Sequence, residues 1–169
     1  METLDHPEHH IVRGYVPGCI GRVAELHGKY YHAYWNFGAY FEARVASDLA
    51  EFVRRYDERR DGLWTVALFD RVEASIAIDA RHSDAEGAHL RWFIVSDALR
   101  GTGVGTRLIE RAIEHCRAMS YPKIYLWTFE GLGAARHLYE KLGFVLVSEE
   151  RDMQWGVEVK GQRLELGLR

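Results

Sequence analysis

The sequence predicts a single α+β domain, and three features of the 169-residue chain lead to that prediction. Apolar residues recur at helical spacing in some segments and at every second position in others, so both helices and strands are expected. Several strand-like segments follow one another directly, without the strict strand–helix alternation of a parallel sheet. Hydrophobic residues make up 47% and charged residues 28%, which is typical of a globular protein with a sizeable core.

The first half of the chain begins with a polar tail, residues 1–10, and we expect the domain to cover residues 11–169. Pro17-Gly18 and the segment 36–38 are breaks, and Asp70-Arg71 joins a hairpin. The expected elements are a strand at 11–15, helices through 20–30 and 41–56, and strands at 63–69 and 72–78.

In the second half, a polar loop at 81–87 precedes a strand at 88–95. A helix starting near Val104 has a continuous apolar stripe and ends at Tyr121-Pro122. Gly143 is expected to end the next helix in a left-handed conformation. The remaining elements are a strand at 123–129, that helix at 131–142, a strand at 144–148 and a last segment at 157–168, which is expected to turn at Lys160-Gly161.

Charge and cysteine content narrow the function classes. With 22 basic and 25 acidic residues the formal net charge is −3, which does not favour nucleic-acid or membrane partners. The two cysteines, Cys19 and Cys116, and the lack of a signal peptide or a long apolar run predict a cytoplasmic protein. His6, His9 and His10 have no accompanying cysteine or carboxylate framework, so no metal site is expected.

The most informative stretch is Arg100-Gly101-Thr102-Gly103-Val104-Gly105-Thr106, between the strand at 88–95 and the helix that follows. Three glycines at alternate positions let the backbone curl and approach a bound group closely. The unpaired amides of the first helical turn and the positive end of the helix dipole favour an anion. Arg100 adds a charge suited to phosphate. The stretch therefore predicts a site for a phosphorylated ligand.

Several interpretations of these glycines compete. A P-loop requires Gly-Lys-Ser/Thr, and no lysine follows Gly105. A dinucleotide-binding loop requires Gly-x-Gly-x-x-Gly, and Thr106 stands where the third glycine is needed. What remains is a glycine-rich turn without a ligand, or the pyrophosphate loop of acetyl-CoA-dependent N-acetyltransferases.

The chain resembles the GNAT superfamily of N-acetyltransferases. Residues 95–105 are similar to its Arg/Gln-x-x-Gly-x-Gly/Ala motif, and residues 135–144, which end in Tyr-Glu-Lys-Leu-Gly-Phe, are similar to its second signature. The resemblance implies a mixed, mostly antiparallel sheet of about six to seven strands with helices on both faces. It also implies that the fourth and fifth strands splay apart.

A closer similarity is to the acetyltransferase domain often fused to MarR-type winged-helix regulators. It rests on four motifs: His27-Gly28-x-x-Tyr31, Phe41-Glu42-Ala43-x-Val45-Ala46, Leu126-Trp127-Thr128 and Gly161-Gln162-x-Leu164-Glu165-Leu166. The ten polar residues before the domain are too few for a winged helix, so DNA binding is not implied.

The GNAT resemblance assigns roles to residues. Backbone groups of Phe93, Ile94 and Val95 would bind the acetyl-pantetheine arm, and Arg100 with the amides from Gly101 to Thr106 would bind the pyrophosphate. Tyr139 is the candidate proton donor to the leaving CoA thiolate. The general base is open between His89, Glu130 and solvent, since His89 stands where many members have a glutamate. Family members often have an asparagine after the fifth strand, and residues 129–132 contain none.

The acceptor site is expected to come from the first helices and the strand ends. His27, Tyr31, Tyr34, Arg91 and Trp127 are the candidate substrate residues; aromatic rings can hold an ammonium group by cation–π contact. The expected partner is a small-molecule primary amine, with acetyl-CoA as donor and no metal. Alternatives are an acyl-CoA sensor with little turnover and an enzyme for longer acyl chains. Residues 157–168 could also form a homodimer contact, by analogy.

Overall fold

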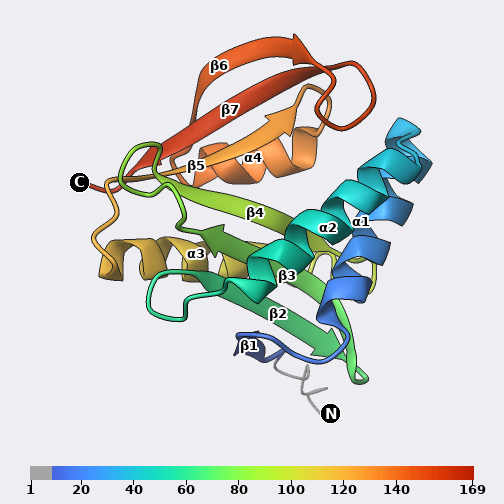
Figure 1. Cartoon of the computed structure of the whole chain (residues 1–169), viewed down its shortest axis with the longest axis horizontal. Helices are drawn as coiled ribbons and strands as arrows, with labels where there is room; N and C mark the ends of the chain where they lie inside the picture. The colour runs from blue at the N-terminus through green and yellow to red at the C-terminus, as the bar shows by residue number, and fades with distance from the viewer. Residues whose placement is uncertain (1–8) are drawn as a thin grey trace, which may run out of the picture.

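The computed structural model describes residues 9–169, so His6 and most of the predicted tail lie outside the described residues. The chain forms a mixed α+β structure (Figure 1). Its elements are β1 (Ile11–Arg13), α1 (Cys19–Trp35), α2 (Ala39–Arg54), β2 (Gly62–Leu68), β3 (Arg71–Asp79), β4 (Ala88–Val95), α3 (Val104–Ala118), β5 (Lys123–Phe129), α4 (Gly133–Lys141), β6 (Val145–Asp152) and β7 (Val159–Gly167).

The seven strands form one sheet in the order β1-β2-β3-β4-β5-β7-β6. Neighbouring strands are antiparallel except β4 and β5, which run parallel. This confirms the predicted fold class. A parallel pair needs a crossover connection, and α3 supplies it between β4 and β5.

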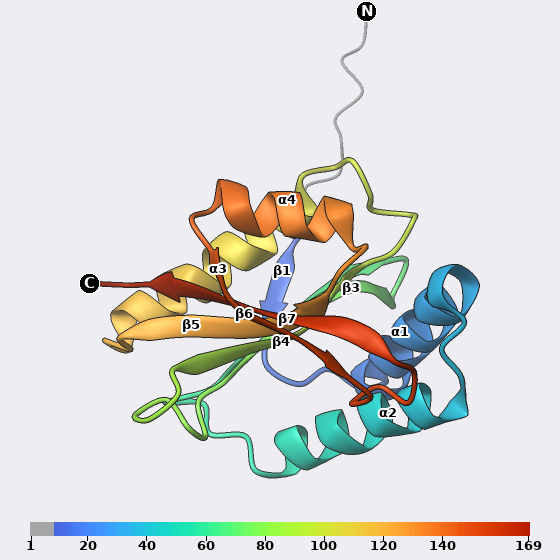
Figure 2. The same ribbon diagram turned by 90° about the horizontal axis from the view of Figure 1, so that it is seen from above.

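Helices cover both faces of the sheet, with α1 and α2 on one face and α3 and α4 on the other (Figure 2). Each face has its own apolar core. Phe41, Leu49 and Phe52 of α2 pack against Trp92 on the first face. Leu108 and Ile109 of α3 lie in the core of the second. Both helices bury the apolar stripe that their sequence periodicity predicts.

The sheet opens between β4 and β5. Their pairing is confined to Ala88 with Ile124 and His89 with Tyr125, at the start of each strand. Beyond His89 the strands diverge, and β5 turns to β7, with which it pairs along its whole length. The edge of β4 from Leu90 to Val95 therefore has no strand beside it. This splay is the feature that the resemblance implies.

A β-bulge interrupts β4 next to the splay. Ala77 of β3 pairs with Arg91 of β4, and Ser75 pairs with Ile94. The two β3 residues are two positions apart and their partners on β4 are three apart, so β4 contains one extra residue. The extra residue is accommodated at Trp92, whose φ of 48° is rare for a residue with a side chain. The Ser75 hydroxyl donates a hydrogen bond of 2.6 Å to the Trp92 carbonyl oxygen. The bulge places Arg91 and Trp92 on the same face of the sheet, where the Arg91 guanidinium lies 4.1 Å from the Trp92 ring centre.

Most element boundaries differ from the prediction by one or two residues, and the larger differences are in α1, β6 and β7. Helix α1 continues to Trp35, and β6 extends to Asp152. The predicted turn at Lys160-Gly161 is wrong, because β7 runs straight through it, with Gly161 paired to Phe129 on one side and Glu150 on the other. A Cβ at Gly161 would collide with the Asp152 carboxylate on β6, so this glycine leaves room for that side chain instead of making a turn. The homodimer contact through this region stays a prediction.

Within residues 9–169, no helix is both long and apolar enough to cross a bilayer. The same residues contain no group of three or more histidine, cysteine, aspartate or glutamate side chains able to hold a metal ion.

Candidate active site

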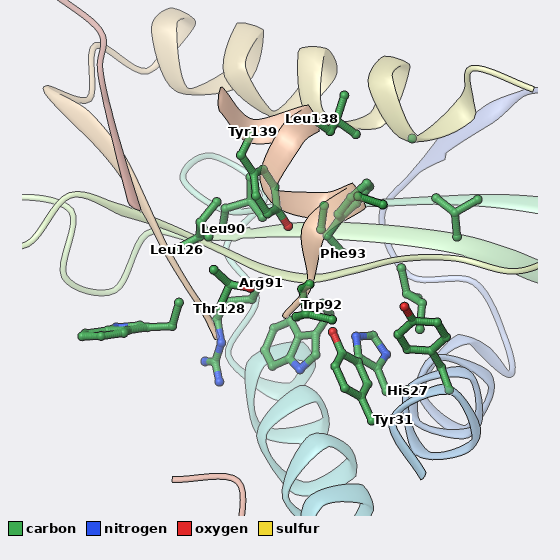
Figure 3. A pocket seen from close by; sticks show the side chains of 18 of the residues that line it. His27, Tyr31, Leu90, Arg91, Trp92, Phe93, Leu126, Thr128, Leu138 and Tyr139 are labelled. Carbon is green, nitrogen blue, oxygen red and sulfur yellow. The ribbon is translucent and has the colours of Figure 1, made fainter. Parts of the chain in front are cut away.

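A cavity of about 690 Å³ occupies the splay between β4 and β5. Helices from both faces of the sheet contribute to its lining, so the cavity passes through the sheet (Figure 3). Tyr31 of α1 and Arg44 of α2 line it on one face, and Thr106 of α3 and Leu138 of α4 line it on the other. Its size is in the range of small-molecule sites. Two ligands entering from opposite faces of the sheet would meet inside it.

The glycine loop forms the end of the cavity beside α3. Gly101 and Gly103 have φ angles of 76° and 82°, which a side chain would strain. Gly105 lies inside the first helical turn, where a Cβ would stand 3.3 Å from the Phe93 ring. The amides of residues 103–106 make no hydrogen bond to any described residue, and no acidic side chain occupies the first turn. Their N–H groups are available to an anion, as predicted from the sequence.

Neighbouring contacts hold the loop in place. Leu99 and Val104 are buried in the core, so Val104 can serve the site only through its amide. The Thr102 hydroxyl donates to the Leu99 carbonyl oxygen at 2.5 Å, and Thr102 does not line the cavity. Arg100 does line it; its guanidinium pairs with Asp97 at 2.7 Å and lies 5.0 Å from the Tyr30 ring centre.

Tyr139 lies on α4 and enters the cavity from the side opposite Tyr31 (Figure 3). Its ring lies 6.0 Å from that of Phe93, beside the unpaired edge of β4. Burial, with a smaller contribution from Tyr31, raises the pKa of Tyr139. The phenol therefore keeps its proton throughout the neutral range. It is suited to donating a hydrogen bond to a developing anion without losing the proton itself.

The two side-chain candidates for the general base are placed differently. His89 lines the cavity at the last β4–β5 pair, with its ring stacked 4.4 Å from Tyr125. Burial, then the charge of Arg91, lowers the pKa of His89 to about 3. An imidazole with so low a pKa accepts a proton poorly at neutral pH. Glu130 is exposed and does not line the cavity.

Four of the five predicted substrate residues line the cavity: His27, Tyr31, Arg91 and Trp127. Tyr34 does not; its side chain is exposed, 4.9 Å from the Tyr30 ring. His27 is buried, and its Nδ1 is 2.8 Å from the Val23 carbonyl oxygen of its own helix. Burial lowers the pKa of His27 to about 4, so the ring is neutral at pH 7.

Comparison with known proteins decides the family. The model of the acetyltransferase (GNAT) family matches residues 21–144, which include the glycine loop and Tyr139. The chain belongs to the GNAT acetyltransferase family. As a GNAT protein it shares its fold with an acetyltransferase from Streptococcus agalactiae (TM-score 0.76, 18% identity, 96% of this chain and 100% of that one). A Salmonella typhimurium structure, yncA, a putative acetyltransferase with its cofactor acetyl-CoA, is similar (TM-score 0.70, 15% identity, 95% of both chains).

Sequence relatives of this GNAT chain include N-acetylaspartate synthetases. The Rattus norvegicus protein is 26% identical over 134 residues, and the Danio rerio protein 29% identical over 125 residues. These matches cover 79% and 73% of this chain. They cover only 45% and 44% of the relatives, so the chain spans less than half of their length.

Two groups of residues in this GNAT site were not predicted from the sequence. Ser75 supports the bulge, and nothing local to Ala74-Ser75-Ile76 indicates that role. Arg44 and Asp48 line the cavity from α2 together with Gln154 and Trp155 of the β6–β7 connection. The Arg44–Asp48 spacing of four residues, beside the apolar stripe of α2, was the available signal.

Proposed function

We propose that this protein is an N-acetyltransferase that moves the acetyl group of acetyl-CoA to the primary amine of a small molecule. The observation that carries the proposal is the cavity that crosses the sheet. One end has unpaired amides and an arginine suited to phosphates, and the other has charged and aromatic side chains. Such a cavity brings an activated acyl group and an acceptor together without a covalent enzyme intermediate.

Acetyl-CoA fits the end of the cavity that the glycine loop forms. Its pyrophosphate would accept hydrogen bonds from the amides of residues 103–106, with Arg100 beside it. The acetyl-pantetheine arm would lie along Phe93, Ile94 and Val95, where β4 has no neighbouring strand. Acetyl-CoA complexes of fold neighbours support this choice of donor.

The reaction needs three events. The acceptor ammonium loses a proton, its nitrogen lone pair attacks the thioester carbonyl, and the tetrahedral intermediate expels CoA thiolate as the amide forms. Tyr139 stabilises the thiolate by a hydrogen bond. Neither His89, with its low pKa, nor Glu130, outside the cavity lining, is well placed to take the first proton. We therefore assign proton removal to solvent at the acceptor end.

The test is release of the CoA thiol from acetyl-CoA in the presence of a panel of primary amines, with mass spectrometry of the product. Amine-dependent release together with an N-acetylated product is expected. Tight acetyl-CoA binding without release for any amine would support the acyl-CoA sensor instead. Faster CoA release from longer acyl-CoA thioesters would indicate that the donor is a longer acyl-CoA and not acetyl-CoA. The names of the N-acetylaspartate synthetase relatives make amino acids the first acceptors to try.

A further inference from the structure

The acceptor end of the cavity contains a compact group of charges: Arg44 and Asp48 on α2 and Arg91 on β4. Asp48 lies between the two arginines. Its Oδ2 is 3.3 Å from Arg91 Nη2 and 3.6 Å from Arg44 Nε. These three side chains are only partly exposed, so their charges act on a ligand with less screening than surface charges would.

This group retains unused hydrogen-bonding capacity. Both arginine contacts fall on Oδ2 of Asp48, and its Oδ1 makes no hydrogen bond within residues 9–169. Arg44 directs one Nη1 hydrogen to the Gln154 carbonyl oxygen and leaves its other terminal nitrogen without a described partner. Asp48 can therefore accept from an ammonium group while Arg44 donates to an anion.

The balance of charge at this end is positive. Behind the cavity, Asp79 contacts Arg91 at 3.2 Å and Arg55 at 2.5 Å, so two arginines share that carboxylate. Arg55 also pairs with Glu51, which in turn pairs with Arg81. Together with Arg44 and Asp48, four guanidinium groups of this network face three carboxylates. One positive charge is left over beside the cavity. The bulge at Trp92 completes this arrangement, because it turns Trp92 to the α2 face, where its ring supports the Arg91 guanidinium.

We propose that the acceptor is an amino carboxylate, such as an α-amino acid, recognised through both of its charged groups. Its carboxylate binds the N–H groups of Arg44 and Arg91, and its ammonium donates to Asp48 Oδ1 before deprotonation. A ligand with a second carboxylate uses both arginines separately. The inference rests on the proposed acetyltransferase function and adds the class of acceptor. A simple amine lacks the carboxylate and leaves the two arginines with no new partner.

The experiment compares matched acceptors in the CoA-release assay: L-phenylalanine with 2-phenylethylamine, and L-aspartate with its dimethyl ester. For the wild-type protein we expect kcat/KM to be about 10–100-fold higher for the member with free carboxylates, the usual range for a charge-assisted hydrogen bond. Arg44→Gln should lower that ratio several-fold without abolishing it, because Arg91 still binds the carboxylate. Asp48→Asn should lower kcat/KM for both members, since both donate an ammonium.

Arg54→Gln is the matched control, because Arg54 is exposed on the same helix and does not line the cavity. For this variant, the ratio of the kcat/KM values for the two matched acceptors should equal that of the wild type. Arg91→Gln is the second test of the anion site, with circular dichroism to verify folding, since that change also leaves Asp79 with one partner fewer. Equal or better turnover of the amines without a free carboxylate by the wild-type protein would overturn this inference and leave the acetyltransferase function standing. No release with any amine would overturn both.

Discussion

Removing the Ser75 hydroxyl should destabilise the bulge that opens the sheet. Ser75 is fully buried, and its hydroxyl is the 2.6 Å donor to the Trp92 carbonyl oxygen. Ser75→Ala leaves that buried carbonyl without its donor, at a cost of about 1–3 kcal/mol. For a domain of this size, 1 kcal/mol corresponds to about 2–4 °C in Tm, so we expect Tm to fall by about 2–12 °C. The substitution removes only one oxygen atom, so the cavity that it leaves adds little to the loss of stability.

The same substitution should affect the reaction. Trp92 holds its positive φ at some cost in strain, and once the serine is gone the strand can relax toward regular pairing. Relaxation would shift the backbone of Phe93, on which the acyl arm is proposed to lie. Because a displacement of about 1 Å can cost about 10²-fold in rate, we expect kcat/KM to fall by 10- to 100-fold.

The assays are urea unfolding, thermal unfolding and CoA release, each with Ser148→Ala as the matched control. Ser148 is exposed on β6, so its replacement should change the free energy of unfolding by no more than about 0.5 kcal/mol. If Ser75→Ala is as stable as Ser148→Ala and keeps the wild-type kcat/KM, the hydroxyl does not support the bulge and the reasoning is wrong.

Three further predictions concern single side chains. Tyr139→Phe should lower kcat by about 10²–10³-fold, the usual cost of losing one hydrogen-bond donor to a developing anion. Calorimetry should show the same acetyl-CoA affinity and the same Tm as for the wild type. An unchanged kcat would remove Tyr139 from the mechanism. Gly103→Ala should lower the free energy of unfolding in urea by about 1–2 kcal/mol, because Gly103 has a φ of 82°. Gly133 has no positive φ, so Gly133→Ala should not lower the free energy of unfolding in this way. His27 has a pKa of about 4 in the folded protein against 6.5 for a free side chain, so its contribution to stability is full above pH 6.5 and is lost as the pH falls from there through 4. Between pH 7.5 and 4.5 the loss from this residue should be about 2–3 kcal/mol, and His27→Gln should show a correspondingly smaller decrease; equal decreases would refute the assignment.

Much of the fold was predictable because local patterns agree with tertiary packing. The apolar stripes of α2 and α3 at helical spacing are the faces that these helices bury. The error at Gly161 has a physical origin. A glycine after a lysine is typical of a turn, but here it leaves room for the Asp152 side chain on the neighbouring strand, and that constraint depends on how β6 and β7 pair.

The site was predictable where one continuous segment forms it. The glycine loop has its predicted conformation because its glycines and the helix start are adjacent in sequence. The acceptor end is different, because Arg44, Arg91 and Gln154 come together only through the fold. Strict alternation along β4 would also have placed Arg91 and Trp92 on opposite faces, and the bulge that reverses this depends on Ser75 of another strand.

The measurement that tests the central claim most directly is calorimetric titration of the protein with acetyl-CoA and with CoA. A double variant, Arg100→Ala with Gly103→Pro, should remove the loop contacts. Arg117→Ala, an exposed arginine near the far end of the same helix, is the control. We predict micromolar binding by the wild type and the control, lost in the double variant when circular dichroism shows that it is folded. Absence of binding by the wild-type protein, or equal binding by the folded double variant, would contradict the placement of acetyl-CoA in the splay.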